Sequence, residues 1–253
     1  MKQKTIGEIK AELKAAEDNL LPDFIEKYSL DERSGVQAAV AQAKKRIEKL
    51  EAERVRIEVL KKYEYEYAEY TYICGIDEAG RGPLAGPVAA GAVILPKDCD
   101  ILYLNDSKQL TPKKREALYD EIMAKAVAVG VGMANEKVID EINVLNADYE
   151  AMKQAISKLQ VKPQLLLNDA VNIPGVDIEQ VGIIKGDTLS ASIAAASIIA
   201  KVTRDRLMVE YDSLYPGYGF AKNMGYGTAE HIDALKKIGP CAIHRRTFIK
   251  NFV

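Results

Sequence analysis

The chain has 253 residues, of which 48% are hydrophobic and 28% charged, and its formal net charge is −2. This length and composition allow a large buried core, which excludes general disorder, and the nearly balanced charge gives no overall attraction to polyanions. The longest apolar runs fall short of the roughly 20 residues that a membrane span needs, so we expect no membrane association. Three widely spaced cysteines without a CxxC pair, and a charged N-terminus unlike a signal peptide, predict reduced thiols in a cytoplasmic protein.

Residues 1–70 differ in composition from the rest of the chain, because they hold 14 Lys/Arg, 15 Asp/Glu and a single proline. Apolar residues recur at helical spacing from Ile6 to Leu20 and again from Val40 to Ile57, and Leu21-Pro22 is expected to end the first helix. The pattern predicts a helical N-terminal extension of two amphipathic helices. From these residues alone, the extension is either a structural appendage or a source of additional substrate contacts.

Residues 71–253 show a different organisation, in which strand patterns alternate with helix patterns and glycine and proline are frequent. Expected strands cover 72–77, 88–95, 127–133, 165–168 and 181–184, and expected helices cover 111–126, 143–159, 189–211 and 229–237. An irregular loop is expected over 213–227, which is rich in Gly, Tyr and Pro. This order predicts an α/β fold, a mixed β-sheet flanked by helices, as one catalytic domain with a helical C-terminal part.

Acidic residues fall at or just beyond the ends of apolar strand patterns; they are Asp77, Glu78, Asp169 and Asp187. An acid is disfavoured there, and strand ends at one edge of an α/β sheet are where sites form. If these carboxylates converge, each pair about 4 Å apart repels by roughly 4 kcal/mol, which divalent cations would relieve. Oxygen ligands without His or Cys suit Mg²⁺ or Mn²⁺. For Asp169 and Asp187, a turn or helix-capping role is the alternative.

The segment Gly75–Val88, GIDEAGRGPLAGPV, closely resembles the signature of the bacterial ribonuclease HII family. Further matches follow in the same order, at Asp106–Lys108, Asn143–Ala147, Gly186-Asp187, Ser192–Asp205, Tyr215–Phe220, Gly225–Thr228 and His244–Phe248. They span about residues 72–250, and several ordered motifs are far more specific than one glycine-rich turn. The departure from the family pattern is Asn168-Asp169-Ala170, where an Ile-Asp-Gly-like step is expected.

The resemblance implies a ribonuclease H-like fold and an endoribonuclease that cuts the RNA strand of RNA–DNA hybrids. It also implies incision of DNA duplexes 5′ to a single embedded ribonucleotide, by two-metal-ion hydrolysis that leaves 3′-hydroxyl and 5′-phosphate ends. The family's catalytic and metal-binding acids correspond to Asp77, Glu78, Asp169 and Asp187, with Mn²⁺ or Mg²⁺ as cofactor. The implied partners are therefore nucleic-acid duplexes, and we expect a monomer.

Substrate recognition in the family implies a second set of residues. Gly80-Arg81-Gly82 would read the 2′-hydroxyl through backbone groups, and Tyr226 would stack on the sugar of the following deoxynucleotide. Further predicted substrate contacts are Lys108, Ser197, Lys201 and Arg204. From the residues alone, Tyr226 is equally consistent with a packed loop aromatic, and each cation with an ordinary surface charge.

Three alternatives compete with this interpretation. Ribonuclease HIII would carry a sheet-forming N-terminal domain and prefer long hybrids, whereas residues 1–70 predict helices and Gly80–Gly82 with Tyr226 favours ribonuclease HII. A non-catalytic hybrid-binding module would not need the intact acids. A phosphate-binding ATPase on the same core would be expected to carry a GxxxxGK[ST] segment, which the sequence lacks.

Overall fold

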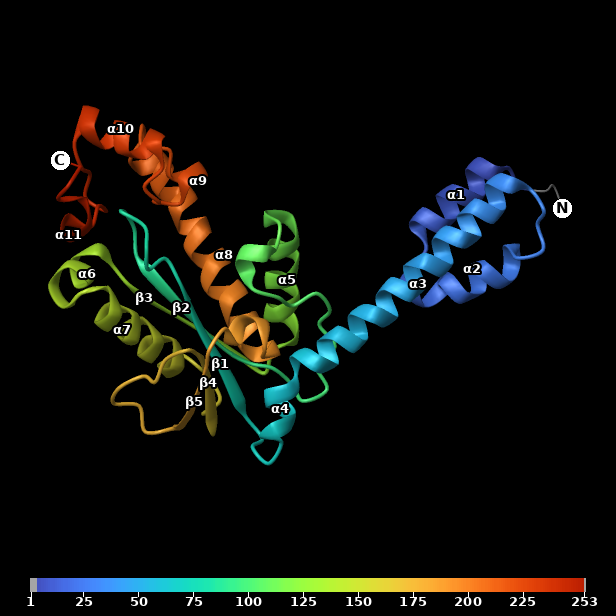
Figure 1. Cartoon of the computed structure of the whole chain (residues 1–253), viewed down its shortest axis with the longest axis horizontal. Helices are drawn as coiled ribbons and strands as arrows, with labels where there is room; N and C mark the ends of the chain where they lie inside the picture. Colours follow the sequence, from blue (N-terminus) through green and yellow to red (C-terminus); the bar gives the residue numbers. More distant parts are fainter. Residues whose placement is uncertain (1–3, 253) are drawn as a thin grey trace. The chain divides into compact units, whose positions relative to one another are not determined.

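The computed structural model describes residues 4–252 and divides into two compact units, Met1–Glu58 and Val59–Val253. The first unit is helical, with α1 (Ile6–Ala15), α2 (Leu21–Tyr28) and most of α3 (Ser34–Leu60) (Figure 1). Pro22 lies in the first turn of α2 and does not end a helix as expected, because the first turn of a helix needs no N–H from that residue. The core of this unit joins all three helices through Ile9, Leu13, Leu21, Phe24, Val36 and Val40.

The second unit contains a five-stranded mixed sheet in the order β3-β2-β1-β4-β5. Its strands are β1 (Ile73–Ala79), β2 (Val88–Ile94), β3 (Ala128–Ala134), β4 (Leu165–Asp169) and β5 (Glu179–Ile183). Its helices are α4 (Lys62–Glu66), α5 (Pro112–Lys125), α6 (Glu136–Ile142), α7 (Val144–Ser157), α8 (Ala191–Leu214), α9 (Phe220–Asn223), α10 (Ala229–Ile238) and α11 (Arg246–Ile249). The first three strands are antiparallel neighbours, whereas β1, β4 and β5 run parallel.

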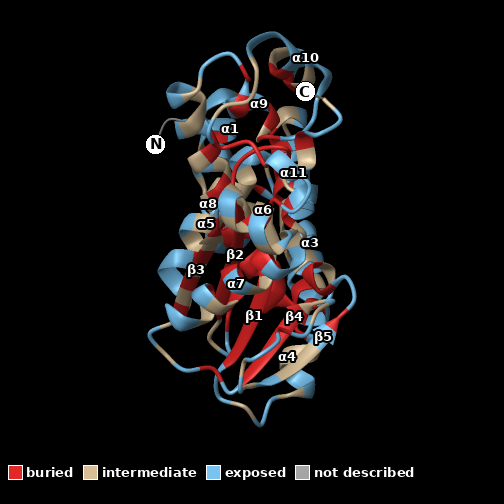
Figure 2. Ribbon diagram, turned by 90° about the vertical axis from the view of Figure 1, so that its left-hand side faces the viewer, coloured by how far each residue is buried: buried red, intermediate tan, exposed pale blue. Residues whose placement is uncertain are grey.

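Helices α7 and α8 cover opposite faces of this sheet, and Figure 2 shows its central strands β1, β2 and β4 as largely buried. Glycines let both helices approach closely. A Cβ on Gly75 of β1 would lie 2.0 Å from the backbone of Ser192 in α8, and one on Gly132 of β3 would lie 1.9 Å from the backbone of Ala151 in α7. The glycines therefore bring α7 and α8 near enough for their side chains to reach the acids on the central strand.

Two local expectations need correction. Strand β1 extends to Ala79, so Asp77 and Glu78 lie within the paired strand and not at its end; they pair with Gly91 and Ala90 of β2. The segment 213–227 is not wholly irregular, because it includes α9. Within residues 4–252, we find no helix with the length and apolar character to cross a membrane.

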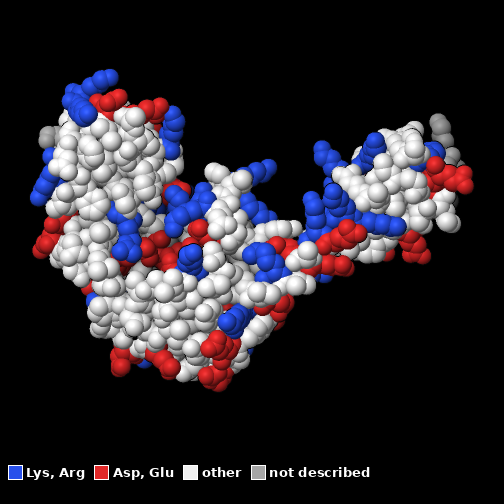
Figure 3. Space-filling view, viewed as in Figure 1, with Lys and Arg blue, Asp and Glu red and all other residues white. Residues whose placement is uncertain are grey.

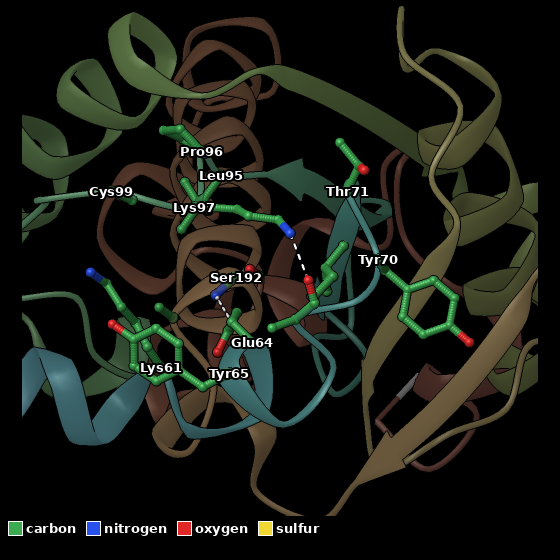
Figure 4. A pocket seen from close by; sticks show the side chains of 13 residues that line it. Lys61, Glu64, Tyr65, Tyr70, Thr71, Leu95, Pro96, Lys97, Cys99 and Ser192 are labelled. Atoms are coloured by element: carbon green, nitrogen blue, oxygen red, sulfur yellow. Dashed lines mark hydrogen bonds between the residues drawn. The ribbon is translucent and has the colours of Figure 1, made fainter.

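Helix α4 contacts the N-terminus of α8 through one carboxylate. Glu64 Oε1 accepts hydrogen bonds from Ser190 Oγ at 2.6 Å and from the backbone N–H of Ser192 at 2.8 Å. Glu64 also lines a cavity of about 110 Å³, shown in Figure 4, where Lys97 Nζ donates to the Ala68 carbonyl at 2.6 Å. An acid at a helix N-terminus satisfies otherwise unpaired N–H groups and complements the helix dipole. Glu64 therefore helps to anchor the helix that carries Ser197.

We expect Glu64→Ala to lower the free energy of unfolding by about 1–2 kcal/mol, because it removes a charged acceptor from the start of α8. Urea unfolding followed by circular dichroism measures this loss. Glu66→Ala, at an exposed position of the same helix, is the matched control and should change stability little. Equal stability of the two variants would show that the contact contributes nothing.

Candidate active site

Two neighbouring strands place three of the predicted acids. Side chains alternate along a strand, so Asp77 faces α8 with Gly75, whereas Glu78 faces α7 with Ile76. The parallel register pairs Ile76 with Asn168, and the next positions are Asp77 and Asp169. Asp169 therefore lies beside Asp77 on the face that α8 covers.

The fourth acid, Asp187, comes from the single 3₁₀ turn Gly186–Thr188, between β5 and α8. This turn is fastened to β4, because the backbone N–H of Gly186 donates to Asp169 Oδ1 at 2.8 Å. Ala170, immediately after Asp169, has a φ of 58°, in the left-handed region that favours glycine. The residue that departs from the family pattern thus adopts the backbone that a glycine would adopt.

Electrostatic interactions link the carboxyl groups of Asp77, Glu78 and Asp169, and Asp187 interacts with Asp169. Burial raises the pKa of Asp77, with further rises from Glu78 and Asp169, while a hydrogen bond from Ser197 opposes them. Burial also raises the pKa of Glu78; Arg81 opposes this rise and Asp169 adds to it. Every one of these carboxyls would be stabilised by added positive charge.

The cluster fits divalent cations by the chemistry of its donors. All four side chains offer hard oxygen atoms, Asp77 is only 3% exposed, and burial together with repulsion disfavours its ionised form. In the described part of the chain, no group of three Asp, Glu, His or Cys side chains stands close enough together to hold a metal ion. A bound cation would have to draw the carboxylates closer against their mutual repulsion. Figure 3 shows acidic atoms in a hollow between α5 and the C-terminal helices, with Lys and Arg along its sides.

Titration of Asp187 should make stability depend on pH. Burial, with repulsion from Asp106 and Asp169, raises the pKa of Asp187 to about 6. A carboxyl whose pKa is higher in the folded than in the unfolded protein stabilises the folded state while it is protonated. This stabilisation is complete below the unfolded-state pKa, near 4, and is lost as the pH rises through about 6. Between about pH 4.5 and 6.5, the Tm without divalent cations should therefore fall more for the wild type than for Asp187→Asn. Parallel Tm curves for the two proteins would contradict this assignment.

Two buried arginines contact the Gly80–Gly82 loop from the interior of the protein. Arg245 donates to the carbonyls of Gly80 at 2.6 Å, Arg81 at 2.8 Å and Gly86 at 2.9 Å. Arg204 contacts the same region from α8, and a Cβ on Gly80, where φ is 97°, would lie 2.1 Å from its Nε atom. Burial, with the neighbouring charge of Arg204, lowers the pKa of Arg245 to about 9. The loop backbone is thus rigidly held beside the acids.

Arg204, predicted to bind a substrate phosphate, lies in the interior of the structure. Its side chain is 1% exposed, and its guanidinium donates to the backbone carbonyls of Pro87, Ala85 and Met224. Ser197 is also buried, at 2% exposure; its hydroxyl oxygen lies 2.9 Å from Ser107 Oγ, and its hydrogen bond to Asp77 lowers the pKa of that acid. Both residues therefore organise the interior of the site, because neither has a free surface for a ligand.

Of the other predicted contacts, Arg81, Gly82, Lys108 and Tyr226 are exposed, Lys201 is half-buried and Gly80 is buried. Tyr226 is 42% exposed, and a Cβ on Gly82 would be 3.8 Å from its ring, so ring and loop are neighbours. Burial lowers the pKa of Lys108, but nearby carboxylates, among them Asp106 and Asp77, raise it overall, which places this cation among the acids. Lys201 forms an ion pair with Asp205 at 2.6 Å.

Two acids near the cluster were missed from the sequence. Asp106 repels Asp187 and also caps a short turn, where it accepts from the backbone N–H of Lys108 at 2.9 Å. Its place beside Ser107-Lys108 in a matched motif was a usable signal. Asp148 is fully buried on α7, and burial, with repulsion from Glu78, raises its pKa to about 8. Its sequence context of alternating polar and apolar helix residues gave no such signal.

Comparisons with known proteins cover both units. A family model described as Ribonuclease HII matches residues 74–251, and one described as Ribonuclease HII N-terminal domain matches residues 5–68. A ribonuclease HII of Lachnoclostridium phytofermentans is 63% identical over 246 residues, or 97% of each chain. The crystal structure of the ribonuclease H2 from Pyrococcus horikoshii is 30% identical, with a TM-score of 0.59 over 70% of this chain and 93% of that chain. The structure of Bst-RNase HIII in complex with Mn²⁺ shares the fold, at 16% identity and a TM-score of 0.51 over 66% of this chain and 61% of that chain.

These findings confirm the predicted fold and the family resemblance. The N-terminal unit is helical and matches the N-terminal domain of ribonuclease HII, which sets aside the ribonuclease HIII alternative. The two family models together match both units of the chain. The chain belongs to the ribonuclease HII family, and it is a hydrolytic endonuclease of the ribonuclease H type that acts on RNA–DNA hybrids.

Proposed function

We propose that this protein also incises DNA duplexes 5′ to single embedded ribonucleotides, leaving 3′-hydroxyl and 5′-phosphate ends. The observation that carries the proposal is the exposed ring of Tyr226 beside Gly82, next to the acidic cluster. A rigid backbone loop and one aromatic ring are enough to sense one ribose and the sugar that follows it. Recognition of one ribonucleotide does not require a long RNA tract.

Asp77, Glu78, Asp169 and Asp187 would hold two divalent cations, Mn²⁺ or Mg²⁺, in the active complex. Bound there, the cations supply Lewis acidity and positive charge for hydrolysis of the scissile phosphodiester. Ser197 keeps the carboxylate of Asp77 oriented through its hydrogen bond. The Gly186 N–H orients Asp169 in the same way. These neutral donors position the acids without neutralising them.

The remaining predicted residues would contact the substrate. The backbone of Gly80–Gly82 would contact the 2′-hydroxyl, since Gly82 has no Cβ to hold the ribose away. Lys108 would contact a phosphate beside the acids. Lys201 would leave its ion pair with Asp205 and contact another phosphate, farther along α8. A protein with balanced overall charge can bind a polyanion this way, because the cations are local. We further propose that it acts as a monomer in the cytoplasm, where its three free thiols would stay reduced.

The test is incision of end-labelled duplexes with Mg²⁺ or Mn²⁺. A duplex with one ribonucleotide should be cut once, on its 5′ side, and the all-DNA duplex should remain intact. Tyr226→Ala should reduce this incision roughly 5- to 150-fold, the range for loss of one stacking contact. Tyr65→Ala, at an exposed tyrosine of α4, is the control and should retain activity. Cleavage of a long hybrid without any incision at one ribonucleotide would refute the proposal.

A further inference from the structure

Asp148 is a buried acid to which the proposed reaction assigns no role. Its side chain is 0% exposed, and neither carboxyl oxygen has a hydrogen-bond partner among the described residues. An isolated carboxylate in such a place costs several kcal/mol unless a cation pairs with it. With its pKa raised to about 8, Asp148 stays largely protonated at neutral pH, and it ionises there only when a cation comes close enough to favour the charged form.

The guanidinium of Arg81 is such a cation. Arg81 Nε lies 3.8 Å from Asp148 Oδ2, and Arg81 Nη1 lies 3.4 Å from Glu78 Oε1. One half-exposed guanidinium thus stands between two acids on the α7 side of the sheet, neither of them at close ion-pair distance. Within residues 4–252, Arg81 favours the ionised form of Asp148, whereas burial and repulsion from Glu78 raise the pKa of Asp148.

The two acids differ in what else they can bind. Glu78 belongs to the proposed cation site, and a cation on its carboxylate would repel the guanidinium of Arg81. We propose that Asp148 is a positioning residue that receives the guanidinium of Arg81 when Glu78 binds a divalent cation. This inference rests on the proposed cation-binding role of Glu78. Without Asp148, Arg81 has only Glu78 as an acidic partner and competes with the cation for it.

Mn²⁺ binding, measured by titration calorimetry on the full chain without substrate, tests this competition. Asp148→Asn keeps the shape of the side chain but has no negative charge to attract Arg81, so we expect Mn²⁺ affinity to fall about fivefold, at the lower end of typical coupling between sites. Adding Arg81→Gln removes the competitor, so the double variant should bind Mn²⁺ as tightly as Arg81→Gln alone. Glu150→Gln, at an exposed position of α7, removes the same charge and should bind like wild type.

Each other outcome gives a definite answer. Wild-type affinity in Asp148→Asn, with weakened binding in Glu78→Gln, would overturn the inference and leave the proposed function standing. Weakened binding that Arg81→Gln does not restore would also overturn it, because Asp148 would then act through its own charge. Wild-type affinity in Glu78→Gln would refute the cation-binding role of Glu78 and the inference together. Tm values without metal confirm that all variants are folded.

Discussion

Asp77→Asn is expected to reduce cleavage of an RNA–DNA hybrid by about 10³-fold or more, the upper range for removing one preorganised polar group from an active site. Asp77 stands at the centre of the acidic cluster, beside Glu78 and Asp169. An amide supplies one oxygen and no charge, so it cannot balance the charge of a divalent cation. The assay is hydrolysis of a labelled hybrid at saturating Mg²⁺.

Thermal stability separates this effect from unfolding. The pKa of Asp77 is raised in the folded protein, so ionisation of this residue destabilises the folded state as the pH rises. Asparagine does not ionise and therefore avoids this destabilisation. Without divalent cations at neutral pH, Asp77→Asn should therefore be at least as stable as the wild type. Asp233→Asn, at an exposed position of α10, should leave both activity and Tm unchanged. Substantial cleavage by a well-folded Asp77→Asn protein would remove Asp77 from the catalytic set.

Among the substitutions considered, Arg245→Met should cause the largest loss in the free energy of unfolding, about 3 kcal/mol or more. The substitution removes the hydrogen-bond donor of the carbonyls of Gly80, Arg81 and Gly86. Each unsatisfied buried group costs about 1–3 kcal/mol, and water that enters a loosened loop would reduce this cost by hydrogen-bonding to the carbonyls. Denaturant unfolding measures the loss. Loosening should also weaken the recognition of the ribose, because the loop backbone would no longer be held in one place.

The neighbouring residue provides the control for this substitution. Arg246 has the same chemistry and an exposed side chain, so Arg246→Met should change stability by less than about 0.5 kcal/mol. Incision at a single ribonucleotide by Arg245→Met should fall even at a temperature where the variant is fully folded. Full activity at that temperature would show that the loop needs no support from Arg245.

Several features of the site were accessible from the residues. Apolar runs that end in acids identified Asp77, Glu78, Asp169 and Asp187, and ordered motifs identified the family and the loop Gly80–Gly82. The family is confirmed, and the acids and the loop could be proposed from the sequence because a carboxylate in an apolar strand and a glycine next to a ligand are local chemical exceptions, visible without coordinates. The helix beginning at Thr111-Pro112 was predictable for a similar reason, since capping and the first turn depend on adjacent residues.

The sequence thus determined the family, the class of sheet and the identity of the clustered acids, all of which depend on residue type and spacing. The direction of each long polar side chain depended on tertiary packing. Arg204 looked like a phosphate ligand one turn after Lys201, yet it turns inward to Pro87 and Ala85, more than a hundred positions away in the chain. Asp148 came to lie beside Arg81 only because α7 packs on the central strand. Long-range packing decides which charges are buried, and local sequence carries no record of it.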